Sequence, residues 1–295
     1  MLTFVPFEEI DKRKWNGTVY SAPNGNISGY YWFLKSVLKE WDALVEGDYQ
    51  SVMPLMRYEP SAFQMEMLYE LGPYTVNAHT NGRMQAFYEA WKEHSGIFSY
   101  PFNHAISRVI LEKNDSFIAS YGLSYIELRE SYERFAERYS QDIKSLLNAA
   151  YITDYIFGGQ EKPEEILKQE KLSNENKNIL YRLMYNAIQR GSGWHAKVSH
   201  QNKTDSADSF YISDHRSIRM LYKSNQNDPT CWAILQDTFF KGNTGRPMKL
   251  YLPNSEKDQW GGNQQNIAIF HNKKDPSITR NSLFNFSFLR KAFRK

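Results

Sequence analysis

The order of helical and extended segments repeats in the two halves of the chain, and this repetition constrains the fold more than any single motif. In the first half, helical segments precede a run of extended segments, a further helix and another extended segment. From about residue 115 the same order returns. Such alternation predicts layered sheets covered by helices. We therefore expect an α/β (α+β layered) chain with two related domains, residues 1–113 and 114–295, the second with a helical excursion at about 160–190.

Apolar spacing locates the elements of the first half. Residues 27–41 have apolar side chains every three or four positions, and residues 81–94 place Met84, Phe87, Tyr88 and Trp91 on one helical face. Between them the runs ALV and SVMPLMRY flank the acidic turn EGD, which predicts a β-hairpin. Pro54 in the second run predicts an edge or a bulge, because proline cannot donate a ladder hydrogen bond. The runs FQMEMLYELGPYTV and IFSYPF are expected to be strands.

The second half is interpreted in the same way. Residues 124–151 carry one apolar stripe and are expected to form a long helix, whereas WHAKVSH, SADSFYI and IRMLYKS are expected to form a strand meander. DPTCWAILQDTFF predicts a helix capped by Asp228 with Pro229 at its first position. MKLYL and SLFNFSFL are expected to be strands, and WGGNQQN a flexible loop. The stripe consists of Leu128, Tyr132, Phe135, Tyr139, Ile143 and Leu146.

Composition bounds the class of protein. Hydrophobic residues make up 41% of the chain, which is enough for packed cores, yet no apolar run approaches the ~20 residues that span a bilayer. The first residues lack the basic-then-apolar order of a signal peptide, so a cytoplasmic location is expected. The 36 basic and 33 acidic residues nearly balance, which argues against DNA binding and leaves weak contact with tRNA open. The single cysteine, Cys231, is expected to be a buried apolar group.

Short stretches across most of the chain carry a family resemblance. They are Trp15 in a short helix, WFL at 32–34, WDALV at 41–45, DY at 48–49, VMPL at 52–55, Phe63-Gln64, LSYIELRESYERFAERYSQDIK in the second half and IAIF before residue 271. At the level of pattern the chain resembles the FemAB-like (FemABX-related) proteins, in particular a largely uncharacterised bacterial branch. The resemblance implies two tandem GNAT-like (Gcn5-related N-acyltransferase) domains, each a mixed, mostly antiparallel sheet flanked by helices.

The resemblance also implies an activity. The chain would be an acyl- or aminoacyltransferase that acylates an amine of a small molecule, a peptide-like acceptor or a cell-envelope precursor. Acyl-CoA or aminoacyl-tRNA would be its donor, and no cofactor is assigned with certainty. The alternative is a catalytically degraded GNAT-fold protein that binds a ligand or partner. It is favoured by LYLPNS at 250–255, where the relatives carry an acidic, glycine-containing stretch.

Five residues are expected to bind substrate if the family's usual cleft is kept: Trp41, Asp42, Arg57, Tyr58 and Gln64. Arg57 would hold a carboxylate or phosphate through two parallel hydrogen bonds. The alternative is that Arg57 is a surface charge at a strand end and Trp41 a core residue. No catalytic residue is assigned.

A CoA pyrophosphate would need free backbone N–H groups at the start of a helix. The loop SNQNDPTC contains no glycine and includes Asp228 and Pro229, which argues against phosphate there, whereas LGPYTVNAHTNGR in the first half is more permissive. His195 and His200 are five residues apart and would point to opposite faces of a strand, so no metal site is predicted. The consecutive residues 214–216 are interpreted as turn chemistry.

The C-terminal tail has two interpretations. Its basic residues beside aromatic side chains would allow peripheral contact with an anionic membrane. Alternatively, the segment is a last strand followed by a solvated end, which we favour. The basic residues are Arg290, Lys291, Arg294 and Lys295.

Overall fold

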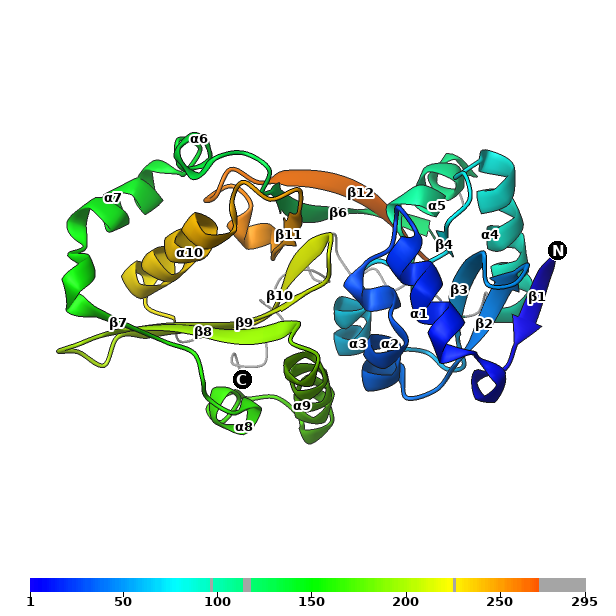
Figure 1. The fold of residues 1–295 in the computed structure, drawn as a ribbon, viewed down its shortest axis with the longest axis horizontal. Coiled ribbons are helices and arrows are strands. Elements are labelled where there is room, and N and C mark those ends of the chain that lie inside the picture. Colours follow the sequence, from blue (N-terminus) through cyan, green and yellow to red (C-terminus); the bar gives the residue numbers. More distant parts are fainter. Residues whose placement is uncertain (96–97, 114–117, 225–226, 271–295) are drawn as a thin grey trace. The chain divides into compact units, whose positions relative to one another are not determined.

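A computed structural model describes residues 1–95, 98–113, 118–224 and 227–270 of the protein. The chain divides into two compact units (Figure 1). Unit 1 holds Met1–Leu123 together with the described residues from Gln265 onward, and unit 2 holds Ser124–Gln264. The domain limits expected from the sequence stay a prediction. The predicted strand SLFNFSFL and the basic tail lie outside the described residues.

An antiparallel sheet organises unit 1. Its strand order is β1-β2-β3-β4, and the predicted hairpin is confirmed as β2 and β3, with Leu44 opposite Met53. The acidic turn between them places Gly47 at φ +59°, in the left-handed region that glycine adopts without strain. β4 pairs with β3 only at Ser51 and Val52, so Pro54 lies beyond that ladder. The strands are β1 (Leu2–Val5), β2 (Trp41–Glu46), β3 (Ser51–Met56) and β4 (Tyr74–Thr75), and a further short strand, β5 (Tyr100–Pro101), pairs with Ile269 and Phe270.

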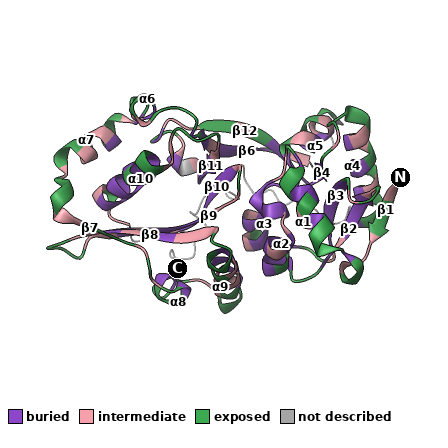
Figure 2. Ribbon diagram, viewed as in Figure 1, coloured by how far each residue is buried: buried purple, intermediate pink, exposed green. Residues whose placement is uncertain are grey.

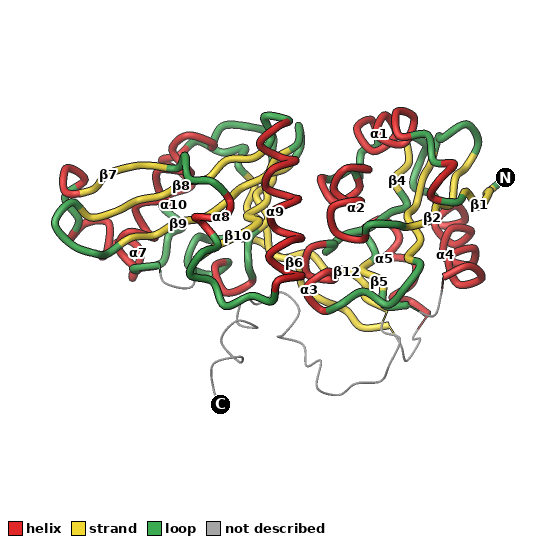
Figure 3. The backbone as a smooth tube through the Cα atoms, turned by 90° about the horizontal axis from the view of Figure 1, so that it is seen from below, coloured by secondary structure: helices red, strands yellow, loops and turns green. Residues whose placement is uncertain are grey.

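Helices cover the sheet of unit 1 on both sides, with α1 and α2 on one side and α4 on the other (Figure 3). Asp11 caps α1 by accepting hydrogen bonds from two backbone N–H groups of its first turn. Trp15 is fully buried and donates from its indole to the carbonyl of Gly29 at 2.8 Å. The helices are α1 (Lys12–Ser21), α2 (Tyr31–Leu38), α3 (Ala62–Met67), α4 (Asn81–Ser95) and α5 (His104–Ile110), with short 3₁₀ turns η1 (Phe7–Glu9), η2 (Ile27–Gly29) and η3 (Leu111–Lys113).

One prediction in unit 1 is wrong. The run FQMEMLYELGPYTV begins as helix α3 and becomes a strand only at Tyr74. The reason is a capping box: the Ser61 side chain accepts from the backbone N–H of Gln64, and the Gln64 side chain accepts from the backbone N–H of Ser61. This reciprocal pair satisfies two donors that a helix start would otherwise leave free.

In unit 2 the strands follow the hydrogen-bonding order β6-β11-β10-β9-β8-β7. The predicted meander is confirmed as the antiparallel strands β8, β9 and β10, whereas β10 and β11 are parallel. Asp214 accepts the backbone N–H groups of Arg216 and Ser217, which confirms the predicted turn chemistry. The strands wholly in unit 2 are β7 (Tyr155–Gly158), β8 (Gly193–His200), β9 (Ser206–Ser213), β10 (Ser217–Lys223) and β11 (Lys249–Tyr251). Two strands are shared with unit 1: β6 (Ile118–Glu127) belongs to unit 2 from Ser124 onward, and β12 (Asn263–Phe270) up to Gln264.

The helices of unit 2 lie on both faces of this sheet, α10 on one face and α8 and α9 on the other (Figure 1). As predicted, Asp228 caps α10 and Pro229 is its first residue. Buried residues concentrate on the strands and on the helix faces turned toward them (Figure 2). The helices are α6 (Tyr132–Ala136), α7 (Gln141–Ala149), α8 (Pro163–Ile166), α9 (Asn174–Gln189) and α10 (Pro229–Asn243), with 3₁₀ turns η4 (Ile152–Asp154) and η5 (Asn254–Glu256).

Two predictions in unit 2 are wrong. Residues 124–151 do not form one helix, because residues 124–127 belong to β6 and a break separates α6 from α7, where Ser140 caps the new helix. The apolar stripe is nevertheless part of the core, since Phe135, Tyr139 and Ile143 are buried against α10. The expected loop WGGNQQN enters strand β12 at Asn263. Among the described residues, none of the helices has the length and apolar character needed to cross a bilayer.

Candidate functional site

The residues expected to bind substrate gather where β2 begins and β3 ends. The antiparallel register places Trp41 opposite Met56 and Asp42 opposite Leu55. Arg57 and Tyr58 follow β3 directly, so the chain brings them beside the first residues of β2. Gln64 lies in α3. Unit 1 therefore assembles this group from two strand ends and the helix that follows them.

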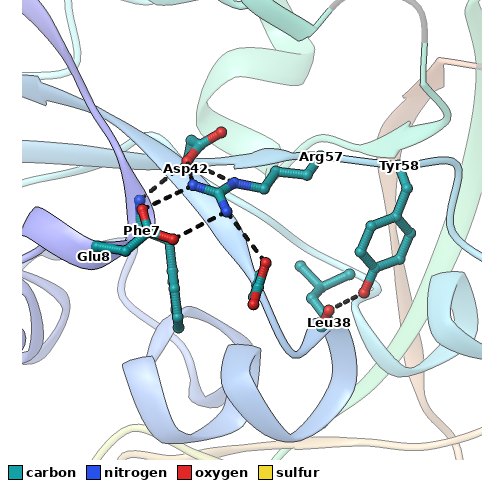
Figure 4. Close-up of polar contacts among 7 residues, drawn as sticks. Phe7, Glu8, Leu38, Asp42, Arg57 and Tyr58 are labelled. Carbon is teal, nitrogen blue, oxygen red and sulfur yellow. Dashed lines mark hydrogen bonds and ion pairs between the residues drawn. The ribbon is translucent and has the colours of Figure 1, made fainter.

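Arg57 is the centre of a cluster of three carboxylates (Figure 4). Its Nε and Nη2 donate to Oδ1 of Asp42 at 2.9 and 2.7 Å. Its Nη1 and Nη2 also donate to Glu8 at 3.2 and 3.1 Å, and Nη1 donates to Glu40 at 3.2 Å. The same oxygen of Asp42 accepts the backbone N–H of Phe7 at 3.0 Å. Arg57, which follows the end of β3, thus connects η1 to the start of β2.

The cluster is electrostatically biased toward cations. The hydrogen bond to Asp42 and then that to Glu8 raise the pKa of Arg57, and the hydrogen bond from Arg57 lowers the pKa of Glu8. One guanidinium faces three carboxylates, which gives a formal net charge of −2. An incoming carboxylate or phosphate would have to displace one of these partners, whereas an ammonium group would be attracted.

The other predicted residues pack beside the cluster or hold the helix end next to it. Trp41 is fully buried, with its ring 4.5 Å from that of Trp15 and 5.6 Å from that of Tyr31. Gln64 is buried and donates to the carbonyl of Val37 at 2.8 Å. Tyr58, which is 37% exposed, donates its hydroxyl to the carbonyl of Leu38. Gln64 and Tyr58 therefore both hold the C-terminal end of α2, directly before β2.

The two helix starts considered for phosphate differ in the charge of the capping side chain and in the space around them. At α10, Asp228 accepts from the backbone N–H groups of Thr230 and Cys231, and Pro229 has none to offer. A phosphate there would compete with a carboxylate. At α4, Thr80 accepts from Arg83, and a side chain added at Gly82 would meet nothing within 4 Å. The start of α4 is therefore the more open of the two.

Among the described residues, the parallel ladder with β11 covers only part of β10. The two strands pair from Ser217–Lys249 to Arg219–Tyr251, whereas β10 continues to Lys223. The pairing of β10 with β9 shifts register between Met220 and Tyr222, which marks an irregularity in this part of the strand. An extended ligand that carries amide groups can bond to such an edge by adding to the sheet.

Sequence reasoning missed a second polar cluster, in unit 2. His195 lies beside Glu161 and Asp208, with Lys197 next to Glu161. The sequence signal was present: His195 and Lys197 are two apart in the predicted strand WHAKVSH, so they share a face, and Asp208 is in the next predicted strand. His200, the other histidine of this strand, lies on the opposite face, with its ring edge-to-face to that of Tyr155.

No protein-family model and no curated protein sequence matches the chain. The fold, in contrast, is similar to solved structures. The crystal structure of FemX has a TM-score of 0.59 at 9% identity, over 89% of this chain and 96% of FemX. A conserved protein of unknown function from Bacteroides thetaiotaomicron gives 0.53 at 11% identity, over 90% and 99% of the two chains.

A further similar structure is described as a tandem GNAT protein from the clavulanic acid biosynthesis pathway. Its TM-score is 0.50 at 9% identity, over 92% of this chain and 97% of that one. At these identities the likeness shows the fold alone. The antiparallel sheet of unit 1 and the mixed sheet of unit 2, each flanked by helices, agree with it. The chain therefore shares its fold with FemX and with a tandem GNAT protein, which is the fold class that the sequence resemblance predicted.

Proposed function

We propose that the chain is an acyl- or aminoacyltransferase that acylates an amine of a small molecule or a cell-envelope precursor. The observation that carries this proposal is the tandem GNAT-like fold, which matches FemX over 89% of this chain and 96% of FemX. A shared fold does not specify a substrate, so the substrate class is inferred from the residues of the site. Acylation of an amine requires an acceptor amine, an activated acyl donor and a group that removes a proton from the amine.

The cluster around Arg57 supports an amine acceptor. Its formal net charge of −2 attracts an ammonium group and disfavours an anion. Trp41, Asp42, Arg57, Tyr58 and Gln64 stay the proposed substrate-binding set, with different roles. Only the exposed parts of Arg57 and Tyr58 and the carboxylates around Arg57 would touch substrate. The buried Trp41 and Gln64 would keep the strand and helix ends in place.

Two observations bear on the donor. Asp228 and Pro229 leave the start of α10 poorly suited to a CoA pyrophosphate, whereas the start of α4 is more open. Within the described residues, β11 does not pair with β10 beyond Arg219, and an extended, amide-containing donor would be able to bond to the backbone there. Acyl-CoA and aminoacyl-tRNA therefore both stay candidate donors, and CoA would bind at the start of α4 in unit 1.

The proposal is tested by measuring acyl transfer with the purified protein. The protein is incubated with labelled acetyl-CoA or with a pool of labelled aminoacyl-tRNAs, together with a panel of amines that includes diamines and lysine-containing peptides, and amide products are measured by mass spectrometry. We expect a product from one donor. We also expect a loss of rate in Arg57→Gln, because the carboxylates that would hold the amine lose the arginine that positions them. Arg13→Gln, an exposed arginine of α1, is the matched control. No product from either donor would contradict the proposal.

A binding protein without turnover is the second candidate. One observation favours it: Glu256, the first acidic residue after β11, is buried, and its carboxylate accepts the indole N–H groups of Trp232 and Trp260 at 3.0 and 3.2 Å. Lys223 binds the same carboxylate. These partners give Glu256 a structural role. A protein that binds donors or amines yet forms no product would support this candidate.

A further inference from the structure

Strand β7 forms an edge of the sheet of unit 2 (Figure 3). On one side it pairs with β8, from Tyr155 opposite His200 to Gly158 opposite Lys197. Among the described residues, no strand pairs with its other side. Charged residues and prolines are common means of keeping an exposed strand edge from pairing with another chain, and β7 contains neither. Its outer edge is therefore open to a further strand.

Large apolar side chains gather at this edge. Tyr151 is 76% exposed, Ile152 and Ile156 are each 57% exposed, and Phe157 is 47% exposed. All of them lie between positions 151 and 157 of the chain. Single exposed apolar residues are ordinary in a soluble protein, whereas a concentration of them marks an interaction site. The apolar residues at β7 form such a concentration.

The side chains of β7 are exposed on both faces of the sheet, which favours a partner that adds a strand. Phe157 lies opposite Val198, a core residue packed with α10, so its side chain is on the α10 face. Ile156 lies opposite Ser199 and points to the other face, where α8 and α9 lie (Figure 1). A partner docked on one face would cover only one of these side chains. A strand added in the plane of the sheet would contact both.

The backbone of β7 also carries hydrogen-bonding groups that point away from β8. The carbonyl of Asp154 accepts the backbone N–H of Gln201, just past the end of β8, at 2.8 Å. The backbone groups of successive strand residues alternate in direction, so those of Ile156 point toward β8 like those of Asp154. Those of Tyr155 and Phe157 point outward. A partner strand would therefore bond to Tyr155 and Phe157.

These outward groups fit an antiparallel copy of the same strand. When Ile156 lies opposite Ile156 of a second copy, Tyr155 lies opposite Phe157 of that copy. The outward N–H and C=O groups of both residues are then paired, as in an antiparallel ladder. The side chains form aromatic pairs on the α10 face and an isoleucine pair on the other, and such cross-strand pairs stabilise a sheet. Asp154 lies opposite Gly158 of the second copy, so like charges do not face each other.

The area of this contact is that of a weak dimer. A fully exposed side chain of this size has ~150–200 Å² of surface, so the exposed parts of Tyr151, Ile152, Ile156 and Phe157 amount to roughly 400 Å² per copy. Two copies would bury roughly 800 Å², which is less than the ~1,200 Å² at which stable interfaces begin. Pairing should therefore depend on concentration. A permanent partner would need a larger surface than this edge.

We propose that β7 is a self-association site, at which two copies of the chain pair antiparallel about a twofold axis through Ile156. Tyr155 and Phe157 supply the backbone hydrogen bonds, and the exposed apolar side chains of the edge are buried between the copies. The sheets of the two copies become continuous across the axis. None of the residues proposed to bind substrate takes part, so pairing is independent of acyl transfer.

Sedimentation equilibrium between about 1 and about 300 µM tests this pairing. We expect the mass of the parent protein to rise from 34.7 kDa toward twice that value, with a Kd of about 10–100 µM. Ile156→Lys and Ile156→Glu should each stay monomeric, since each places like charges opposite one another. An equimolar mixture of the two variants should dimerise, because position 156 faces its own copy. Ile188→Lys, at an exposed position of α9, should associate as the parent does.

Hydrogen exchange followed by NMR gives a second readout on the parent protein. Exchange of the amides of Tyr155 and Phe157 should slow as the concentration rises, whereas that of Ile156, whose N–H points toward β8, should change little. Circular dichroism shows whether each variant is folded.

Four results would overturn the proposal. The parent stays monomeric at every concentration, Ile156→Lys dimerises as the parent does, the mixed variants stay monomeric, or exchange of the two amides does not depend on concentration. Protection of these amides at every concentration would mean that another segment of the same chain covers the edge. None of these measurements uses an acyl donor, so absent transfer activity would not affect them.

Discussion

Arg57 donates from both Nε and Nη2 to a single oxygen of Asp42, at 2.9 and 2.7 Å. That oxygen also accepts the backbone N–H of Phe7. Three parts of unit 1, namely η1, the start of β2 and the end of β3, therefore meet at one carboxylate. The side chains of Arg57 and Asp42 are 29% and 16% exposed, so water screens the pair less than it would at the surface.

This relationship predicts a loss of stability when Arg57 is replaced. Arg57→Gln leaves Asp42, Glu8 and Glu40 close together without their shared cation. We expect the free energy of unfolding to fall by about 2–3 kcal/mol, measured by urea denaturation. Arg13→Gln, on the exposed side of α1, should change it by less than about 0.5 kcal/mol. Equal stability of the Arg57 variant and the parent would show that the ion pairs contribute nothing to the fold.

Gln64 allows two contacts to be separated. Gln64→Ala removes both the capping box and the donor to Val37, and should lower the free energy of unfolding by about 1–2 kcal/mol. Gln64→Glu keeps an acceptor for the backbone N–H of Ser61 but places a carboxylate against the carbonyl of Val37, so it should be no more stable than the alanine variant. Thermal and urea denaturation would measure both. A fully stable Gln64→Glu variant would contradict the structural role.

Glu46 should make unit 1 sensitive to acid. Burial acts to raise its pKa, but the hydrogen bonds from Ser51 and Arg83 outweigh it, and the net pKa is lowered. A carboxylate with a lowered pKa contributes stability above its unfolded pKa of about 4.3, and this contribution is lost as the pH falls through the folded pKa. Glu46→Gln should therefore lose less stability than the parent between pH 5 and pH 3, in urea denaturation series. Parallel curves for the two proteins would refute this.

Cys231 should be inert in the folded protein. Burial, and then the charge of Asp228, raise the pKa of its thiol to about 12, so little thiolate exists at neutral pH. We expect very slow reaction with a disulfide reagent in buffer and rapid reaction in concentrated guanidinium chloride. Spectrophotometric thiol titration measures both rates. Fast labelling of the native protein would mean that the thiol is accessible. The structure already confirms that Cys231 is buried.

The elements predicted correctly from sequence are those with local signals. The β2–β3 hairpin has two apolar runs about a tight turn, and α10 has Asp228 and Pro229 at its start. The errors occur where local and tertiary signals disagree. The apolar stripe of residues 124–151 continues through a strand end and two helices, because all of these segments pack on one core. Periodicity reports the buried face and does not show where Ser140 begins a new helix.

Only part of the candidate site could be predicted from the sequence. Hairpin register brings Arg57 close to Asp42, so that pair could be predicted. Glu8 is 49 residues from Arg57, and its contact depends on how the segment after β1 returns to β2. The contact between Glu161 and His195 likewise joins a loop to a strand 34 positions away. No local pattern encodes such distances, and without a tertiary structure an arginine among three carboxylates cannot be distinguished from a free one.

Acyl transfer is the central claim, and one measurement tests it most directly. A reaction that contains the folded protein, an isotopically labelled acyl donor and a mixed panel of primary amines is analysed by mass spectrometry for a labelled amide. We predict an amide that forms only with the protein, from acetyl-CoA or from aminoacyl-tRNA, at a rate that falls in Arg57→Gln relative to Arg13→Gln. A folded, amine-binding protein that leaves both donors unconsumed would contradict the claim and support the binding protein in its place.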